Sequence, residues 1–160
     1  MASIRKEIQT SASPEQAWAA LRDVGALHTR LVPGFVVDTR LESGERIVTF
    51  GNGMVIREPI IDINDELRRV AWSAIGGSLT HYNGSAQVLV DANNRTSVVW
   101  IADFLPNDAA EQINLMMGVV GAPELVSGAV PQRTGASGCE AWRRPIATSV
   151  PACRATVQAQ

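Results

Sequence analysis

His81 and Asp103 are the residues whose types best suit proton transfer in this sequence. A histidine beside a carboxylate can shuttle a proton during an enolisation or a dehydration. Both residues lie in strand-like stretches of one hairpin, where they could meet on adjacent strands. Each occupies the polar phase of its strand, opposite Tyr82 and Phe104, which favours a pair that faces solvent. A β-bulge would reverse this assignment, because a slip of one residue exchanges the two faces.

Arg57 is a further candidate. Glu58 follows it directly on a predicted strand, so only one of the two side chains can point into an interior. An inward Arg57 could anchor a carboxylate or polarise a carbonyl. A cross-strand ion pair on the surface is the commoner use of such a residue. We therefore keep Arg57 as a catalytic candidate beside His81 and Asp103.

Several kinds of chemistry have no motif in the chain. The sequence contains no GxSxG elbow, no glycine-rich phosphate loop and no HExxH pair. Its two cysteines, Cys139 and Cys153, belong to no Cys/His cluster, so we expect neither a metal nor a cofactor. The net charge of −2 gives no electrostatic case for nucleic acid.

The 160 residues are enough for one domain with a core of its own. The N-terminus shows no secretory signal, and no run of roughly 18 apolar residues could insert into a membrane. We therefore expect a cytoplasmic protein that interacts with neither nucleic acid nor the membrane interior.

The elements that must position these residues are mostly strands. Apolar and polar residues alternate along both arms of a hairpin over 80–106, whose turn lies at 91–94. Further strands are predicted at 4–10, 35–41, 46–50, 54–63 and 67–74, with Pro59 at a bulge or an edge position. Because short turns separate the last six strands, we expect them to be antiparallel.

Helices are predicted after the first strand and after the last. Ser13, Pro14 and Gln16 form a helix start with a capping box, and a second short helix covers 26–31. Asp108 and Glu111 form a second capping-box pair. Apolar residues at helical spacing follow that pair up to Val120, and the helical pattern stops at Gly121.

This order of elements and two of its strings resemble a known family. The strings are SPEQAWAALRDVGALHTRLVPG and HYNGSAQV…TSVVWIADFLP, and they are similar to the polyketide cyclase/dehydrase branch of the START/Bet v 1-like (SRPBCC) superfamily. The resemblance covers residues 3 to about 120. It implies an α+β helix-grip fold, β-α-α-β6-α, in which a seven-stranded curved antiparallel sheet surrounds a C-terminal helix. Two short helices follow the first strand.

The same resemblance implies an apolar cavity between sheet and helix. Members of the superfamily bind lipids, sterols, polyketides, plant hormones or quinones, and some catalyse cyclisation, dehydration or isomerisation. The alternation predicts which residues of this chain face such a cavity. The candidate ligand-binding residues are Phe50, Met54, Trp72, Tyr82, Asn83, Trp100, Phe104, Met116 and Met117. An ordinary packed core is the alternative interpretation of the same residues.

We expect a helix-grip domain over 1–122 and a tail rich in glycine, proline and serine over 123–160. Three hypotheses follow for function. The first is binding of a small hydrophobic molecule, oriented by Tyr82, Asn83 or Arg57. The second is an enzyme of polyketide cyclase or dehydratase type that uses polar cavity residues for proton transfer. The third is a homodimeric, partner-binding protein whose core is filled.

Overall fold

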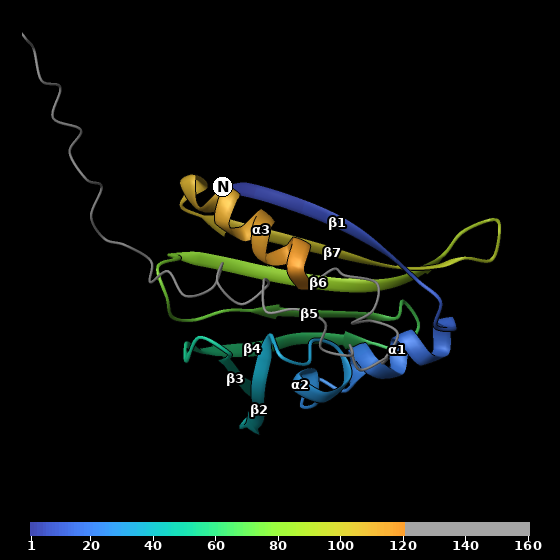
Figure 1. Ribbon diagram of the computed structural model, residues 1–160, viewed down its shortest axis with the longest axis horizontal. Helices are drawn as coiled ribbons and strands as arrows, with labels where there is room; N and C mark the ends of the chain where they lie inside the picture. Colours follow the sequence, from blue (N-terminus) through green and yellow to red (C-terminus); the bar gives the residue numbers. More distant parts are fainter. Residues whose placement is uncertain (121–160) are drawn as a thin grey trace, which may run out of the picture.

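A computed structural model of the chain describes residues 1–120 (Figure 1). The predicted stop at Gly121 and the predicted tail over 123–160 lie outside the described residues. In chain order the elements are β1 (Ala2–Thr10), α1 (Pro14–Arg22), α2 (Leu27–Arg30), β2 (Val36–Glu42), β3 (Glu45–Phe50), β4 (Val55–Asn64), β5 (Arg69–Ser73), β6 (His81–Val90), β7 (Thr96–Leu105), the 3₁₀ turn η1 (Asn107–Ala109) and α3 (Ala110–Val120).

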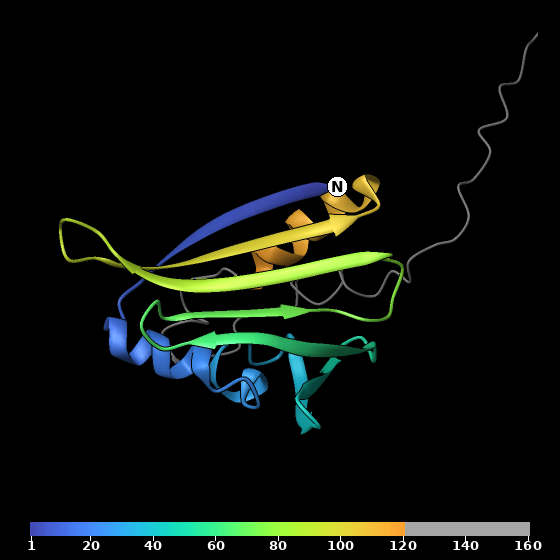
Figure 2. The same cartoon turned by 180° about the vertical axis from the view of Figure 1, so that it is seen from behind.

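The seven strands form one curved antiparallel sheet in the order β1-β7-β6-β5-β4-β3-β2. In Figure 1 the helix α3 lies across one face of this sheet, and α1 and α2 close one end of it. Figure 2 shows the opposite face, on which no helix of the described residues lies over the strands. The predicted helix-grip architecture is confirmed over residues 1–120.

The long hairpin β6–β7 sets which side chains face the helix. Its register pairs Tyr82 with Phe104 and Ala86 with Trp100, without a shift from one end to the other. From Tyr82 to Val88 the residues of β6 on this face are buried, and those between them are partly or fully exposed. The period of two therefore gives β6 one apolar face and one polar face, as its sequence predicts.

Pro59 lies in β4, a strand that has partners on both sides. The ladder with β3 ends at Pro59, and the ladder with β5 begins at the next residue, Ile60. The register with β5 then shifts between Ile60 and Asp62. A proline cannot donate to a ladder, so it is tolerated where one ladder gives way to another. The predicted bulge is present directly after it.

The helix α1 begins as predicted. Ser13 accepts a hydrogen bond from the backbone N–H of Gln16 at 3.2 Å, and the Gln16 side chain accepts one from the Ser13 N–H at 2.9 Å. Its buried face carries Trp18, whose indole N–H donates to Asp65 at 3.0 Å. Arg22 donates to the same carboxylate at 2.7 Å. Asp65, in the turn after β4, thus holds α1 against the sheet.

The helix α3 begins later than predicted. Asp108 lies inside the 3₁₀ turn η1 and not at a helix N-cap, and the α-helix starts at Ala110. Proline at position 106 precedes this turn, so the chain leaves β7 through a tight turn before it can become α-helical. From α3 the side chains of Ile113 and Met117 enter the core. No helix in residues 1–120 has the length and apolar character needed to cross a bilayer.

Candidate ligand-binding cavity

A cavity of about 950 Å³ lies between the sheet, α2 and α3. Both strands and helices contribute to its wall, which is mainly apolar. Of the predicted ligand-binding residues, six line it: Phe50, Met54, Trp72, Tyr82, Trp100 and Met116. The filled core that the third hypothesis requires is therefore absent from the described part of the chain, although a homodimer stays a prediction.

Three of the predicted residues do not line this cavity. Phe104 and Met117 are fully buried at 0% exposure and belong to the packed core. They face the interior, as their spacing indicates, but they are not part of the cavity wall. Asn83 lies on the opposite face of the sheet, where it is paired with Asp103 beside a shallow groove. Its prediction as a cavity residue is wrong, because it follows the polar phase of β6.

The catalytic candidates His81 and Asp103 also lie on the outer face. His81 is paired with Leu105, and Asp103 is paired with Asn83, so the two candidates are offset diagonally on neighbouring strands. The continuous register of β6–β7 contains no bulge that could turn them inward. The solvent-facing interpretation therefore describes this pair, and neither residue contributes to the cavity.

Arg57 points away from the cavity as well. Its guanidinium donates to Glu45 Oε2 at 2.9 Å and 2.6 Å, which makes a cross-strand ion pair on the outer face. The surface ion pair named as the commoner use of Arg57 is the one present, the inward alternative is wrong, and its neighbour Glu58 takes the inward position instead. Two adjacent residues of one strand face opposite sides, so an outward Arg57 requires an inward Glu58.

Glu58 is paired with a buried arginine that the sequence analysis did not single out. Arg46 on β3 stands directly opposite Glu58 on β4, and its Nε donates to Glu58 Oε2 at 2.5 Å. The two residues are only 4% and 9% exposed, and both line the cavity. Burial raises the pKa of the Glu58 carboxyl, and the charge of Arg46 opposes that rise. A guanidinium keeps its proton at any physiological pH, so Arg46 brings a permanent positive charge into the cavity wall.

The signal for this pair was present in the sequence. Arg46 is two residues from Val48 on β3 and therefore shares the inward phase of that strand. Glu58 shares the phase of Ile56 on β4 in the same way, and Val48 and Ile56 are themselves paired. A strict reading of the period of two, applied without regard to residue type, would have placed both charged side chains inside.

Trp72 connects the ion pair with the rest of the cavity wall. The Arg46 guanidinium lies 4.8 Å from the centroid of the Trp72 ring, which is a cation–π contact. The Trp72 ring also lies 6.4 Å from the ring of Trp100, centroid to centroid, at an angle of 40°. The cavity therefore has a wall of two indoles beside a buried charge pair.

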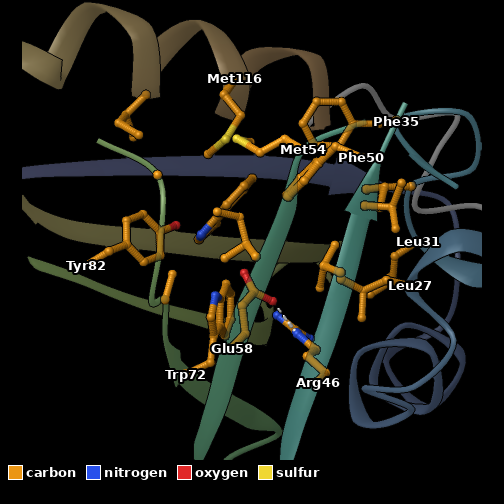
Figure 3. A pocket seen from close by; sticks show the side chains of 18 of the residues that line it. Leu27, Leu31, Phe35, Arg46, Phe50, Met54, Glu58, Trp72, Tyr82 and Met116 are labelled. Carbon is orange, nitrogen blue, oxygen red and sulfur yellow. Dashed lines mark hydrogen bonds and ion pairs between the residues drawn. The ribbon is translucent and has the colours of Figure 1, made fainter. Parts of the chain in front are cut away.

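Tyr82 and Trp100 bring two more polar groups to this wall. Burial raises the pKa of the Tyr82 hydroxyl, and the negative charge of Glu58 adds to the rise, so the hydroxyl stays protonated. The Trp100 indole N–H lies near enough to this hydroxyl oxygen to favour its ionised form. The N–H is nevertheless buried, and within residues 1–120 it has no partner at normal hydrogen-bond distance and angle. In Figure 3 the Tyr82 hydroxyl and the Glu58 carboxylate point toward the same part of the cavity.

The opposite side of the cavity is apolar. Phe35 and Phe50 meet edge to face, with their ring centroids 5.3 Å apart. Met54, in the turn before β4, and Met116, on α3, extend toward these rings (Figure 3). Flexible thioether side chains suit a guest of irregular shape. The cavity thus has an apolar side and a polar side, which would orient any guest that has the same division.

Comparison with known proteins agrees with this architecture. Residues 1–132 match the model of a family described as polyketide cyclase / dehydrase and lipid transport. A search of curated proteins gave no match to the sequence. The family match covers the whole sheet, all described helices and every residue of the cavity wall.

Solved structures give the same picture. The protein XoxI from Bacillus cereus is 25% identical and superposes with a TM-score of 0.70, over 81% of this chain and 95% of its own. Truncated norcoclaurine synthase from Thalictrum flavum is 18% identical, with a TM-score of 0.62 over 83% and 95%. The di-domain ARO/CYC protein BexL from the BE-7585A biosynthetic pathway is 13% identical, with a TM-score of 0.65 over 79% and 46%. The last two similarities show the fold alone.

Proposed function

Because the chain belongs to the polyketide cyclase/dehydrase and lipid transport family, we propose that it binds a small hydrophobic molecule in the cavity between its sheet and α3. The observation that carries this proposal is the cavity itself. Its volume of about 950 Å³ is at the upper end of the range for small-molecule sites, and its wall is mainly apolar with a few converging polar groups. Burial of the ligand's apolar surface would supply the affinity.

The proposal predicts a bound compound in protein taken from cells. Purified protein is denatured in organic solvent, and the extract is analysed by mass spectrometry against the protein concentration. We expect an apolar compound at close to one molecule per chain. Repeated empty preparations, with no stabilisation by a panel of lipids and aromatic polyketides, would contradict the proposal.

Two substitutions on one strand make the matched control. Ala86 is buried, lines the cavity and lies between Val70 and Trp100 on the neighbouring strands. Ala86→Phe would fill the void, whereas Ser85→Phe places the same ring on the outer face. The extracted compound should be lost from Ala86→Phe and kept by Ser85→Phe.

A second candidate function is proton transfer, and one observation favours it: a buried carboxyl, that of Glu58, faces the cavity. A Glu58 carboxylate could take a proton from the carbon next to a ligand's keto group. The C–H electron pair would pass to the keto oxygen as an enolate, which the protonated Tyr82 hydroxyl could stabilise by donating a hydrogen bond. Return of a proton to the same carbon completes an exchange.

Exchange of ketone protons tests this second candidate. The ketone 2-tetralone is incubated with the protein in D₂O, and loss of its α-proton signals is followed by NMR. General acid–base catalysis predicts an exchange that Glu58→Gln slows by roughly 10²-fold or more. Equal rates for the two proteins would leave binding as the only function that the cavity supports.

A further inference from the structure

We propose that the polar side of the cavity, formed by Arg46, Glu58, Tyr82 and Trp100, selects ligands whose polar end is an uncharged hydroxyl or keto group on an aromatic body. It would disfavour ligands that end in a carboxylate. The inference rests on the proposed function, because it concerns the ligand of the same cavity.

Arg46 and Glu58 balance each other's charge in the cavity wall. A lone buried arginine would recruit an anionic ligand, but Arg46 already donates to Glu58 at 2.5 Å and is covered by the Trp72 ring. A ligand carboxylate would meet the Glu58 carboxylate within the same desolvated wall. Like charges repel strongly where water cannot screen them. Repulsion from Glu58 therefore offsets the attraction that an anionic ligand would feel toward Arg46.

The hydrogen-bonding groups on this side also suit an uncharged polar end. The Trp100 indole N–H is buried beside the Tyr82 hydroxyl, without a good partner among the described residues, and an indole N–H can only donate. Tyr82 is buried and remains a donor, while the Glu58 carboxylate accepts. A ligand hydroxyl can accept from Tyr82 and donate to Glu58, and a keto group can accept from Tyr82. A hydrocarbon would leave both of these groups without a ligand partner.

The cavity wall also suits an aromatic body. The rings of Trp72 and Trp100 lie 6.4 Å apart, centroid to centroid, next to the polar groups, and the partly exposed Trp100 offers a surface against which a flat ring can pack. Figure 3 shows Tyr82 and Trp72 on the same side of the cavity as the Glu58 carboxylate. An aromatic ring that carries a hydroxyl would therefore contact both kinds of group at once.

Three naphthalene probes test the proposal on the unmodified protein: naphthalene, 2-naphthol and 2-naphthoate. Their affinities are measured by calorimetry at about pH 8, where a phenolic hydroxyl is still uncharged and a carboxylate is ionised. We expect 2-naphthol to bind about tenfold more tightly than naphthalene, the gain that one or two net hydrogen bonds supply. We expect 2-naphthoate to bind at least about tenfold more weakly than 2-naphthol.

Two conservative variants assign the effect to residues. Glu58→Gln leaves the charge of Arg46 without its partner. This variant should therefore bind 2-naphthoate more tightly than 2-naphthol, and 2-naphthoate should raise its melting temperature. Tyr82→Phe removes one donor and should weaken 2-naphthol several-fold without changing naphthalene. If Glu58→Gln does not fold, the proposal is tested by the relative affinities of the three probes for the wild type and by the effect of Tyr82→Phe.

The outcomes separate this inference from the proposed function. Naphthalene and 2-naphthol binding equally well would overturn the inference and leave hydrophobic binding intact. A wild-type protein that binds 2-naphthoate as tightly as 2-naphthol would also overturn it. If none of the three probes binds, the selectivity proposal fails, and extraction of an apolar compound from cells then decides whether the proposed function fails with it.

Discussion

The indole of Trp72 lies directly over the backbone of Gly84, its partner on the neighbouring strand. A Cβ atom at position 84 would stand 2.5 Å from Trp72 Cε2, closer than real carbon atoms approach. The absence of a side chain at Gly84 therefore lets the indole lie flat in the cavity wall, where it contacts both the Arg46 guanidinium and the Trp100 ring. A glycine in the middle of a strand otherwise weakens it.

Gly84→Ala should destabilise the protein. The added methyl group must displace the Trp72 ring, and overpacking of this kind costs about 1–3 kcal/mol of unfolding free energy. The free energy of unfolding is measured by urea denaturation, monitored by tryptophan fluorescence. Gly118→Ala is the control, because no atom of the other described residues lies within 4 Å of the new methyl group, and alanine in an exposed helix should gain about 0.5–1 kcal/mol.

Shortening the indole should relieve the clash. In a Trp72→Leu background, Gly84→Ala should cost much less than in the wild-type protein, and the difference between the two costs is the coupling energy. Equal costs in both backgrounds would show that the glycine is needed for another reason than contact with Trp72.

Removing one member of the Arg46–Glu58 pair should be far more harmful than removing both. Glu58→Leu leaves a buried guanidinium without its partner, which should cost about 3–5 kcal/mol of unfolding free energy. The double variant Arg46→Met with Glu58→Leu replaces the pair by apolar side chains and should be neutral or more stable than the wild type by up to about 4 kcal/mol. The free energy of unfolding is measured by chemical denaturation. A double variant whose loss equals the sum of the losses in the two single variants would contradict this account of the pair.

The raised pKa of Glu58 gives a pH dependence of defined sign. The folded protein holds this proton more tightly than the unfolded chain, so the stabilising contribution of Glu58 is complete below its ordinary pKa of 4.5. It is lost as the pH rises through the higher folded pKa. The stability of the wild type relative to Glu58→Gln should therefore fall as the pH is raised from 4.5. If this relative stability instead rises as the pH is raised from 4.5, the pKa of Glu58 is lowered in the folded protein and not raised.

Asp65 should show the opposite dependence. Hydrogen bonds from Arg22 and Trp18 lower the pKa of its carboxyl below the ordinary value of 3.8. Its contribution is present above that value and is lost as the pH falls through the lower folded pKa. Asp65→Asn should therefore destabilise the protein near neutral pH and make it less sensitive to acid. A constant difference between the two proteins across this range would argue against the contact.

The strand phases explain how much of the fold was predictable. Along β6 the residues Tyr82 and Ala86 alternate with polar neighbours, so sequence alone assigned them to the inner face, and the structure agrees. The same period places Phe104 inward but says nothing of depth. Whether an inward residue lines a void or packs against a neighbour depends on α3, whose position the sequence of one strand does not contain.

Two polar residues that were candidates for orienting a ligand face outward. Asn83 follows the polar phase of β6, and Arg57 forms the surface ion pair that was the commoner expectation for it. The polar groups that face the cavity are charged residues on apolar phases, Arg46 and Glu58, which satisfy each other. Their pairing depends on the register between β3 and β4, and the turn between these strands does not reveal it from its residues.

Titration with the neutral fluorescent probe N-phenyl-1-naphthylamine tests the central claim most directly, because Trp72 and Trp100 in the cavity wall can transfer excitation energy to a bound probe. We expect saturable one-site binding to the wild type and to Ser85→Phe, and an affinity at least about tenfold lower for Ala86→Phe, whose ring occupies the void. Equal titrations for the two phenylalanine variants, or no saturable signal from the wild type, would contradict the claim that this cavity is a binding site.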